Sequence, residues 1–214
     1  MIYHFLSSQY ALEDLERRRL KIAQFHDMND PFELLALELS DKTIRRSYRA
    51  FVREMARNYG VLCFSRRWGN PVLWSNYADK HRGICLGFEV PSNCLLEVRY
   101  AANRLPKTIN AELKAGGLDQ DDMKEILGTK FKSWEYEEES RVFLRLEDRD
   151  PNSGLYFKKF GSDLTLTQVI LGARCEVTKA KALERMGAAA TSVRLVKARL
   201  AFTEFGIVRN KQVG

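Results

Sequence analysis

Two glutamates, Glu137 and Glu139, lie two residues apart at the end of an acidic run that leads into an alternating apolar pattern. Residues i and i+2 of an extended strand point to the same face, so the two carboxylates are expected to lie together. Carboxylates held close together raise the pKa of one of them, so that one stays ionised while the other exchanges a proton. Arg141 continues this face and is expected to hold one carboxylate in a charge-assisted pair. The pattern predicts a catalytic pair, but a solvated acidic patch that offsets the many arginines also fits.

Few histidines are available for catalysis or metal binding, because the chain has only His4, His26 and His81. His4 lies in the predicted first strand, where an imidazole is either a satisfied core group or a ligand contact. Ser65 follows the apolar run VLCF, but no base lies near it in sequence, so a Ser-His-Asp triad is not supported. The sequence also lacks a histidine or acidic motif with metal-ligand spacing, so we expect no protein-bound metal.

Basic and polar side chains form two further candidate surfaces. A helix predicted over residues 41–59 carries an apolar stripe and, beside it, a cationic stripe that includes Arg45, Arg49 and Arg53. Such a stripe is either a solvated face or a surface for a polyanion. The polar turn that starts at Asn29 and Asp30 is either a simple turn or a ligand-facing loop.

The elements that must position these groups centre on residues 60–88. Gly60 is expected to end the preceding helix in a left-handed conformation, followed by the buried strand VLCF. Asn70 and Pro71 begin a short helix that carries Trp74 and Tyr77, and the apolar run ICLGFEV predicts a strand buried on both faces.

The later part of the chain alternates between helical and extended patterns. A long helix is predicted from Asp119, as its cap, to about Trp134. The strand that follows, around residues 139–146, is expected to pair in antiparallel fashion with LYFKKF.

These patterns predict an α+β fold: one globular domain over residues 1–214, with about seven strands in mixed or antiparallel sheets and about four helices. Hydrophobic residues at 45% and charged residues at 29% are globular values. We find no spanning segment or signal peptide and expect a cytoplasmic protein without membrane contact, whose four cysteines are reduced. The net charge of +7 and pI near 9.3 favour polyanionic partners such as nucleic acid or dinucleotides.

The polar signatures, taken in order, resemble a bacterial family known as domain of unknown function 2971. The residues that carry the resemblance are Asn29-Asp30-Pro31-Phe32-Glu33, Cys63-Phe64-Ser65, Trp74-x-x-Tyr77-Ala78 with Gly83 and Gly87-Phe88, Trp134-x-Tyr136-Glu137-x-Glu139-x-Arg141, and Ile170-Leu171-Gly172. This resemblance covers most of the chain but implies no activity.

A more distant resemblance is to ADP-ribosyltransferase-like folds, which combine a first-strand His or Arg, a Ser or Tyr, and a Glu at the start of a later strand. It implies that His4 and Tyr77 hold the nicotinamide ribose of NAD as substrate, while Ser65 orients the site. Glu139 would stabilise the oxocarbenium-like charge and Glu137 would steer the acceptor. Further expected contacts are Trp74 and Arg141 for NAD and, from the polar turn and the cationic stripe, Asn29, Asp30, Arg45, Arg49 and Arg53 for the substrate.

Three functions remain open from the sequence. The first is an NAD-using ADP-ribosyltransferase-like enzyme acting on nucleic acid or protein in a toxin or phage-defence setting. The second is a nucleic-acid-binding or processing module without NAD, which would use the arginine stripe. The third is a non-catalytic interaction domain in which Trp74 and Tyr77 belong to the core. The oligomeric state is not readable from the sequence.

Overall fold

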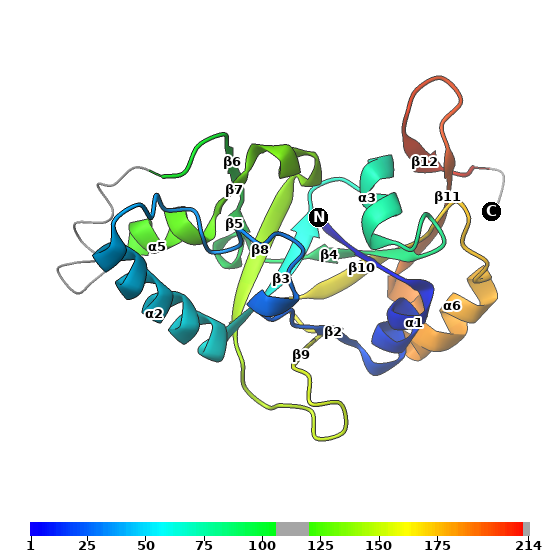
Figure 1. The fold of residues 1–214 in the computed structure, drawn as a ribbon. Helices are drawn as coiled ribbons and strands as arrows, with labels where there is room; N and C mark the ends of the chain where they lie inside the picture. Colours follow the sequence, from blue (N-terminus) through cyan, green and yellow to red (C-terminus); the bar gives the residue numbers. More distant parts are fainter. Residues whose placement is uncertain (106–119, 212–214) are drawn as a thin grey trace.

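The buried strands of the chain join in one eight-stranded sheet, in a computed structural model that describes residues 1–105 and 120–211 (Figure 1). All neighbouring strands pair in antiparallel fashion except β10 and β11, which run parallel, so the sheet is mixed. This confirms the predicted α+β class with a mixed sheet. In spatial order the strands are β12 (Ile207–Arg209), β11 (Arg194–Leu200), β10 (Thr165–Leu171), β4 (Ile84–Glu89), β1 (Ile2–Leu6), β3 (Tyr59–Ser65), β8 (Glu139–Arg145) and β5 (Leu96–Glu97).

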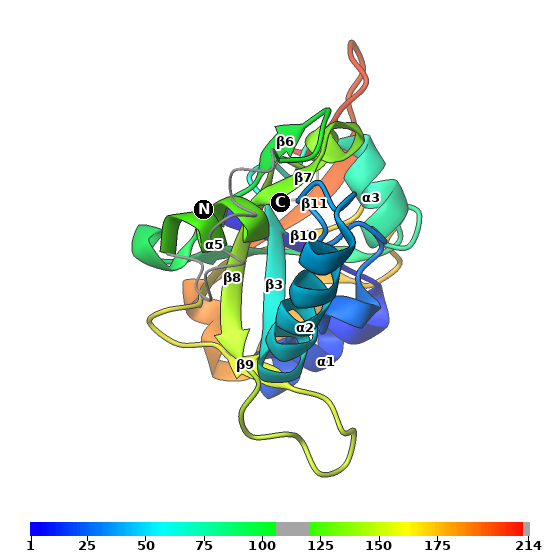
Figure 2. The same ribbon diagram turned by 60° about the vertical axis from the view of Figure 1, so that its left-hand side comes forward.

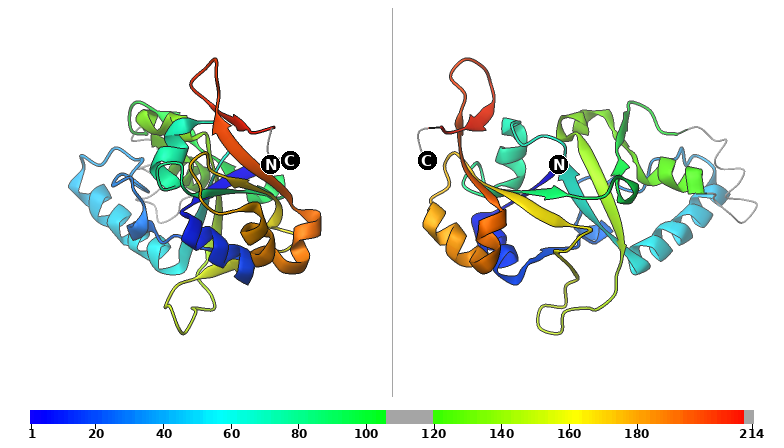
Figure 3. Two further views of the ribbon diagram at one scale, coloured as in Figure 1. Left: turned by 90° about the vertical axis from the view of Figure 1, so that its right-hand side faces the viewer. Right: turned by 180° about the vertical axis from the view of Figure 1, so that it is seen from behind.

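Helices gather at the two ends of this sheet (Figures 1 and 3). At one end α1 (Ser8–Arg17) lies beside α6 (Lys179–Met186), and at the other are α2 (Lys42–Asn58) and α5 (Gln120–Leu127). With α3 (Pro71–Tyr77), the described residues contain five α-helices, one more than the approximate number expected. Short 3-10 helices span Phe25–Asp27, Ser92–Cys94, Lys132–Glu137 and Gly187–Ser192. Two small sheets pair β2 (Arg19–Lys21) with β9 (Phe157–Lys159) and β6 (Arg99–Ala101) with β7 (Thr129–Phe131).

Strand β4 shows why the sheet is covered on both faces. Its side chains alternate between two separate cores, because successive residues of a strand point to opposite faces. Leu86 packs in the larger core with Leu15 of α1, whereas Cys85 packs in a second core with Trp74 of α3. The prediction that ICLGFEV is buried on both faces is therefore confirmed.

The junction of α2 with β3 differs from the predicted one. Asp41 caps α2 by accepting hydrogen bonds from the backbone amides of Thr43 and Ile44, as is typical of a helix start. At the other end Tyr59 is already extended, with φ −132°, so a left-handed end at Gly60 is wrong. Gly60 lies inside β3, where a Cβ atom would lie 2.5 Å from Cγ2 of Ile22. The glycine provides close strand packing there and does not end the helix.

The predicted helix to Trp134 is also wrong. Helix α5 ends at Leu127, and the next residues form β7, which pairs in parallel with β6. The apolar residues of this segment have helical spacing, but the pairing of β7 with β6 overrides that local preference. Asp119, the predicted cap, lies outside the described residues.

The predicted partner of β8 is wrong as well. Phe157–Lys159 of LYFKKF pair with β2, while β3 and β5 occupy the two edges of β8. Figure 2 shows β3 and β8 side by side, with α2 next to β3.

All four cysteines are free, as expected. Among the described residues, the helices are too short or too polar for any of them to cross a membrane.

Candidate functional site

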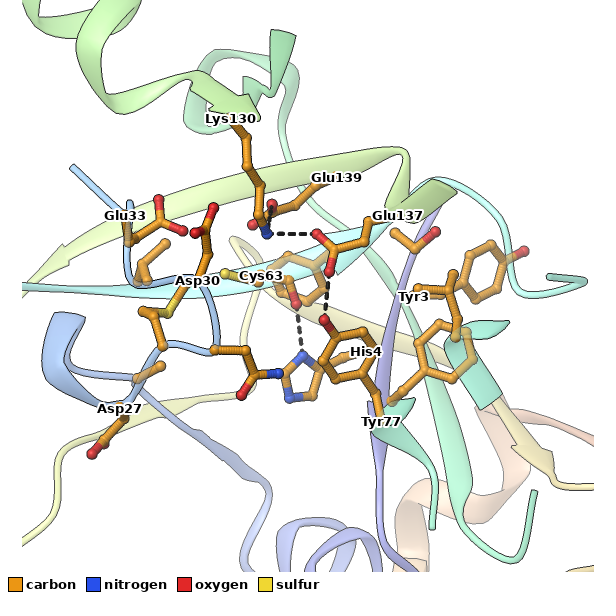
Figure 4. Close-up of a pocket in the computed structure, with 18 of the residues that line it drawn as sticks. Tyr3, His4, Asp27, Asp30, Glu33, Cys63, Tyr77, Lys130, Glu137 and Glu139 are labelled. Carbon is orange, nitrogen blue, oxygen red and sulfur yellow. Dashed lines mark hydrogen bonds and ion pairs between the residues drawn. The ribbon is translucent and has the colours of Figure 1, made fainter. Parts of the chain in front are cut away.

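A cavity of about 180 Å³ opens where β1, β3 and the start of β8 approach α3 (Figure 4). Most of the residues singled out from the sequence line it, although they come from distant parts of the chain. They are His4, Asn29, Asp30, Ser65, Tyr77, Glu137 and Glu139. The convergence of His4, Tyr77 and Glu139, which the sequence leaves open, is present in the fold.

Strand register brings these groups together. In the β1–β3 pair Tyr3 lies opposite Ser65, and in the β3–β8 pair Ser65 lies opposite Glu139. The three residues therefore form a row across neighbouring strands at the same edge of the cavity. His4 follows Tyr3 in β1, and Tyr77 reaches the cavity from the last position of α3.

A buried lysine joins the two glutamates. Nζ of Lys130, on β7, donates to Oε2 of Glu137 at 2.6 Å and to Oε2 of Glu139 at 3.0 Å (Figure 4). All three residues are buried, so the reading of Glu137 and Glu139 as a solvated acidic patch is wrong. The strand argument for their convergence is wrong too, because Glu137 ends a 3-10 helix and Glu138 is left-handed. Their shared cation brings their carboxylates together.

A second cation, Arg141, also binds Glu139. Arg141 is fully buried and donates from Nε to Oε1 of Glu139 at 2.8 Å. Its other nitrogens bind both carboxylate oxygens of Glu33 at 2.6 and 3.1 Å and the carbonyl of Leu127 at 2.8 Å. Such forked, charge-assisted bonds fix the geometry of both carboxylates.

The two glutamates differ in pKa. Burial raises the pKa of Glu137, and the attraction of Lys130 and the hydrogen bond from Tyr77 offset this only in part. Burial also acts to raise the pKa of Glu139, but Arg141 and Lys130 outweigh it and lower the pKa to about 2. Glu139 is therefore ionised at neutral pH, while Glu137 exchanges its proton at higher pH than an ordinary glutamate does.

Tyr77 and His4 add two oriented polar groups. The Tyr77 hydroxyl donates to Oε1 of Glu137 at 2.5 Å, and burial followed by this bond raises the pKa of Tyr77. Nδ1 of His4 lies 2.8 Å from the carbonyl of Cys63; a carbonyl can only accept, so Nδ1 carries the hydrogen. Burial lowers the pKa of His4, which leaves Nε2 of the neutral ring as an acceptor.

One comparison with known proteins is informative for this region. A family model described as "Protein of unknown function (DUF2971)" matches residues 73–142. This match confirms the resemblance over residues 73–142, the DUF2971 segment, which contains Tyr77, Lys130, Glu137, Glu139 and Arg141; the signatures at residues 29–33, 63–65 and 170–172 lie outside it. Comparison with curated proteins and with solved structures finds no match to this chain.

Two polar residues that precede the DUF2971 segment use their side chains in local turns. The Ser65 hydroxyl donates to the carbonyl of Arg67 at 2.9 Å and accepts from its amide at 3.1 Å. Oδ1 of Asp30 accepts from the amide of Phe32 at 2.9 Å. The polar turn is thus both a turn and a wall of the cavity, because Asn29 and Asp30 also line it.

Several predicted contacts do not reach this cavity. Trp74, in the DUF2971 segment, is completely buried in the second core and donates from Nε1 to the carbonyl of Trp68 at 2.5 Å. Arg141 holds two carboxylates from within the protein and is absent from the lining. The α2 arginines Arg45, Arg49 and Arg53 are absent from it as well.

Sequence reasoning missed Lys130, Glu33 and Cys63. Lys130 fell in a segment that the sequence predicts as helix, so nothing marked it as a partner of the glutamates. Glu33 ends the polar turn, but nothing in the sequence links it to Arg141, which lies 108 residues later. Cys63 takes part through its backbone carbonyl, for which a sequence gives no signal.

Proposed function

We propose that the chain is an NAD-using transferase of the ADP-ribosyltransferase-like kind. The observation that supports this best is the meeting of His4, Tyr77, Glu137 and Glu139 at one cavity. The resemblance read from the sequence requires these residue types on a first strand, a central helix and the start of a later strand. In this reaction the bond between nicotinamide and ribose breaks, and the bond electrons leave with the nicotinamide nitrogen. A nucleophilic acceptor then bonds to the ribose carbon.

The charge balance of the site fits a cationic substrate. With Glu137 ionised, the buried cluster has three carboxylates and two cations, an excess of one negative charge in a chain whose net charge is +7, and the other charged lining residues (Asp27, Asp30 and Lys21) formally add one more. The carboxylates are Glu33, Glu137 and Glu139, and the cations are Lys130 and Arg141. A buried site with excess negative charge stabilises the pyridinium ring of NAD and the oxocarbenium-like charge that develops on the ribose as the bond breaks.

Each lining group has a defined task in this proposal. Glu139, ionised because its pKa is about 2, faces the developing positive charge. Glu137, with its raised pKa, takes the proton of the acceptor, since a base whose pKa is nearer neutrality is the more effective one. Neutral His4 offers Nε2 to a ribose hydroxyl. Tyr77 orients Glu137 through its donated hydrogen, and its oxygen accepts from the same ribose.

The size of the cavity limits which part of NAD it encloses. Pockets that enclose drug-sized ligands measure roughly 300–1,000 Å³, whereas this one measures about 180 Å³. The nicotinamide ribose end fits such a volume, and the rest of a dinucleotide must lie outside it.

The test is calorimetric titration with NAD, followed by proton NMR for released nicotinamide. Tyr77→Phe should weaken NAD binding, and Glu139→Gln should lower nicotinamide release by orders of magnitude. Tyr10→Phe and Glu135→Gln are matched controls, because both side chains are exposed and neither lines the cavity. Thermal melting confirms that each variant is folded. The absence of both heat and nicotinamide at millimolar NAD would refute the proposal.

A second candidate function is binding of nucleic acid by α2, either as the acceptor or without NAD. Its support is that Arg49, Arg53 and Arg57 are exposed at regular spacing, and within residues 1–105 and 120–211 no acidic side chain pairs with them. Reversal of Arg49 and Arg53 to glutamate should then abolish a salt-dependent affinity for RNA or DNA and leave NAD binding unchanged. Binding that survives the reversal would exclude this surface.

A further inference from the structure

A second cavity, of about 270 Å³, lies beside the first. It is lined mainly by apolar side chains, with four polar ones: an amide, a guanidinium, a hydroxyl and an ammonium group. The lining consists of Phe32, Leu35, Ala36, Ala101, Ala102, Asn103, Arg104, Thr129, Lys130 and Phe131.

The two cavities share their dividing wall, which two segments form. Strand β7 is one: Lys130 lines both cavities, with its Nζ bonded to Glu137 in the first, and its neighbours Thr129 and Phe131 line the second. The polar turn is the other, because Asp30 lines the first cavity and Phe32 the second. A ligand that extends past this wall can occupy both.

The second cavity carries the groups that bind flat aromatic rings. Phe32 and Phe131 are 54% and 49% exposed, and both line the same cavity, so two aromatic rings are open to a ligand there. The guanidinium carbon of Arg104 lies 5.3 Å from the centre of the Phe32 ring, and its NH1 donates to the carbonyl of Leu37 at 3.3 Å. Aromatic faces and a guanidinium plane bind nucleobases by stacking with little dependence on which base is present.

The backbone around Arg104 gives this cavity a fixed wall. Leu105 donates its amide to the carbonyl of Ala36, and Glu38 donates its amide to the carbonyl of Leu105. On the other side β6 pairs with β7, with Ala101 opposite Phe131. Phe131 therefore lies on paired backbone, and the backbone of Phe32 is held in the polar turn by bonds with Asp30 and Leu35, so both can bind a ring with little ordering of the protein.

We propose that the second cavity binds a nucleobase, which stacks on Phe131 in the cavity that Phe32 and Arg104 also line. The inference rests on the proposed function in one respect: the first cavity takes only the nicotinamide ribose end, so the base belongs to the same ligand or to its acceptor. The chemistry is the same for the adenine of NAD and for a base of an acceptor nucleic acid.

Two fragments test the two cavities separately. AMP carries the base without nicotinamide and should bind the second cavity, whereas nicotinamide mononucleotide should bind the first. Phe131→Ala should weaken AMP binding about 5- to 150-fold, the range that loss of one base–aromatic stack produces. The same variant should leave nicotinamide mononucleotide binding unchanged. Phe205→Ala is the matched control, because Phe205 is fully exposed and absent from the lining of both cavities.

Competition identifies the source of the base. Displacement of AMP by NAD assigns the cavity to the adenine end, while displacement by a short single-stranded oligonucleotide but not by NAD assigns it to the acceptor. The proposal is overturned if AMP does not bind, or if Phe131→Ala and Phe205→Ala weaken AMP binding equally. AMP binding that depends on Phe131 supports it even if no nicotinamide is released, so its failure and that of the proposed function are distinguishable.

Discussion

Replacement of Lys130 by methionine should strongly destabilise the fold. Methionine keeps an unbranched apolar stem of similar length but removes the only charge within bonding distance of Glu137 Oε2 among the described residues. The side chains of Lys130, Glu137 and Glu139 are only 7, 8 and 4% exposed, so water from the adjoining cavity can replace the lost cation only in part. Breaking a buried ion pair in this way costs about 3–5 kcal/mol. Glu139 keeps Arg141, so Glu137 bears most of this loss.

The loss should depend on pH in a defined direction. Burial already raises the pKa of Glu137, and removal of Lys130 should raise it further. A carboxyl group whose folded pKa is raised adds stability that is fully present below its unfolded pKa and lost as pH rises through the folded value. Lys130→Met should therefore be much less stable than the wild type at pH 8 and approach it toward pH 5, where Glu137 takes up a proton. The double variant Lys130→Met/Glu137→Gln should regain most of the stability at pH 8.

Urea unfolding at pH 5.5 and 8 measures these differences. Lys132→Met is the matched control: Lys132 Nζ bonds Glu135 Oε1 at 2.7 Å, but the two side chains are 55 and 56% exposed. Exposed pairs contribute about 0–1 kcal/mol, so this control should lose little. Equal losses in Lys130→Met and Lys132→Met would refute the reasoning. A double variant less stable than Lys130→Met at pH 8 would refute it too.

Three further substitutions test other parts of the fold. Arg141→Met leaves two buried carboxylates without their shared cation and should lower stability by at least about 3–5 kcal/mol, seen as a large fall in melting temperature or loss of soluble protein. Tyr48→Phe leaves the carbonyl of Leu34 without its buried hydroxyl donor and should cost about 1–3 kcal/mol in urea unfolding, with an unchanged slope. Gly83→Ala places a Cβ atom 2.1 Å from the carbonyl oxygen of Leu6 and should weaken the β1–β4 pairing, measured by faster amide hydrogen exchange in β1.

Local patterns in the sequence predicted the elements whose signals are local. The predicted first strand is β1 (Ile2–Leu6), the helix predicted over residues 41–59 is α2 (Lys42–Asn58), and β4 is buried on both faces. Local patterns do not specify which strands pair, because any strand with an unpaired edge can accept another strand. LYFKKF was assigned to β8, whose edges are occupied by β3 and β5, and it pairs with β2 instead. Gly60 read as a helix end because a glycine that permits close packing has the same sequence signal.

The candidate site shows the same division between local and long-range signals. The sequence places Glu137, Glu139 and Arg141 on neighbouring positions, yet it cannot show that Lys130 binds both glutamates. The chain makes this contact by reversing through the 3-10 helix Lys132–Glu137, which the left-handed Glu138 ends. Lys130 lies seven and nine residues before Glu137 and Glu139 and on a different element, so no single helix or strand repeat in the sequence links the three residues. Without that reversal the two carboxylates would repel each other in the interior, so the turn and the lysine are needed together for a buried acidic pair to exist in this fold.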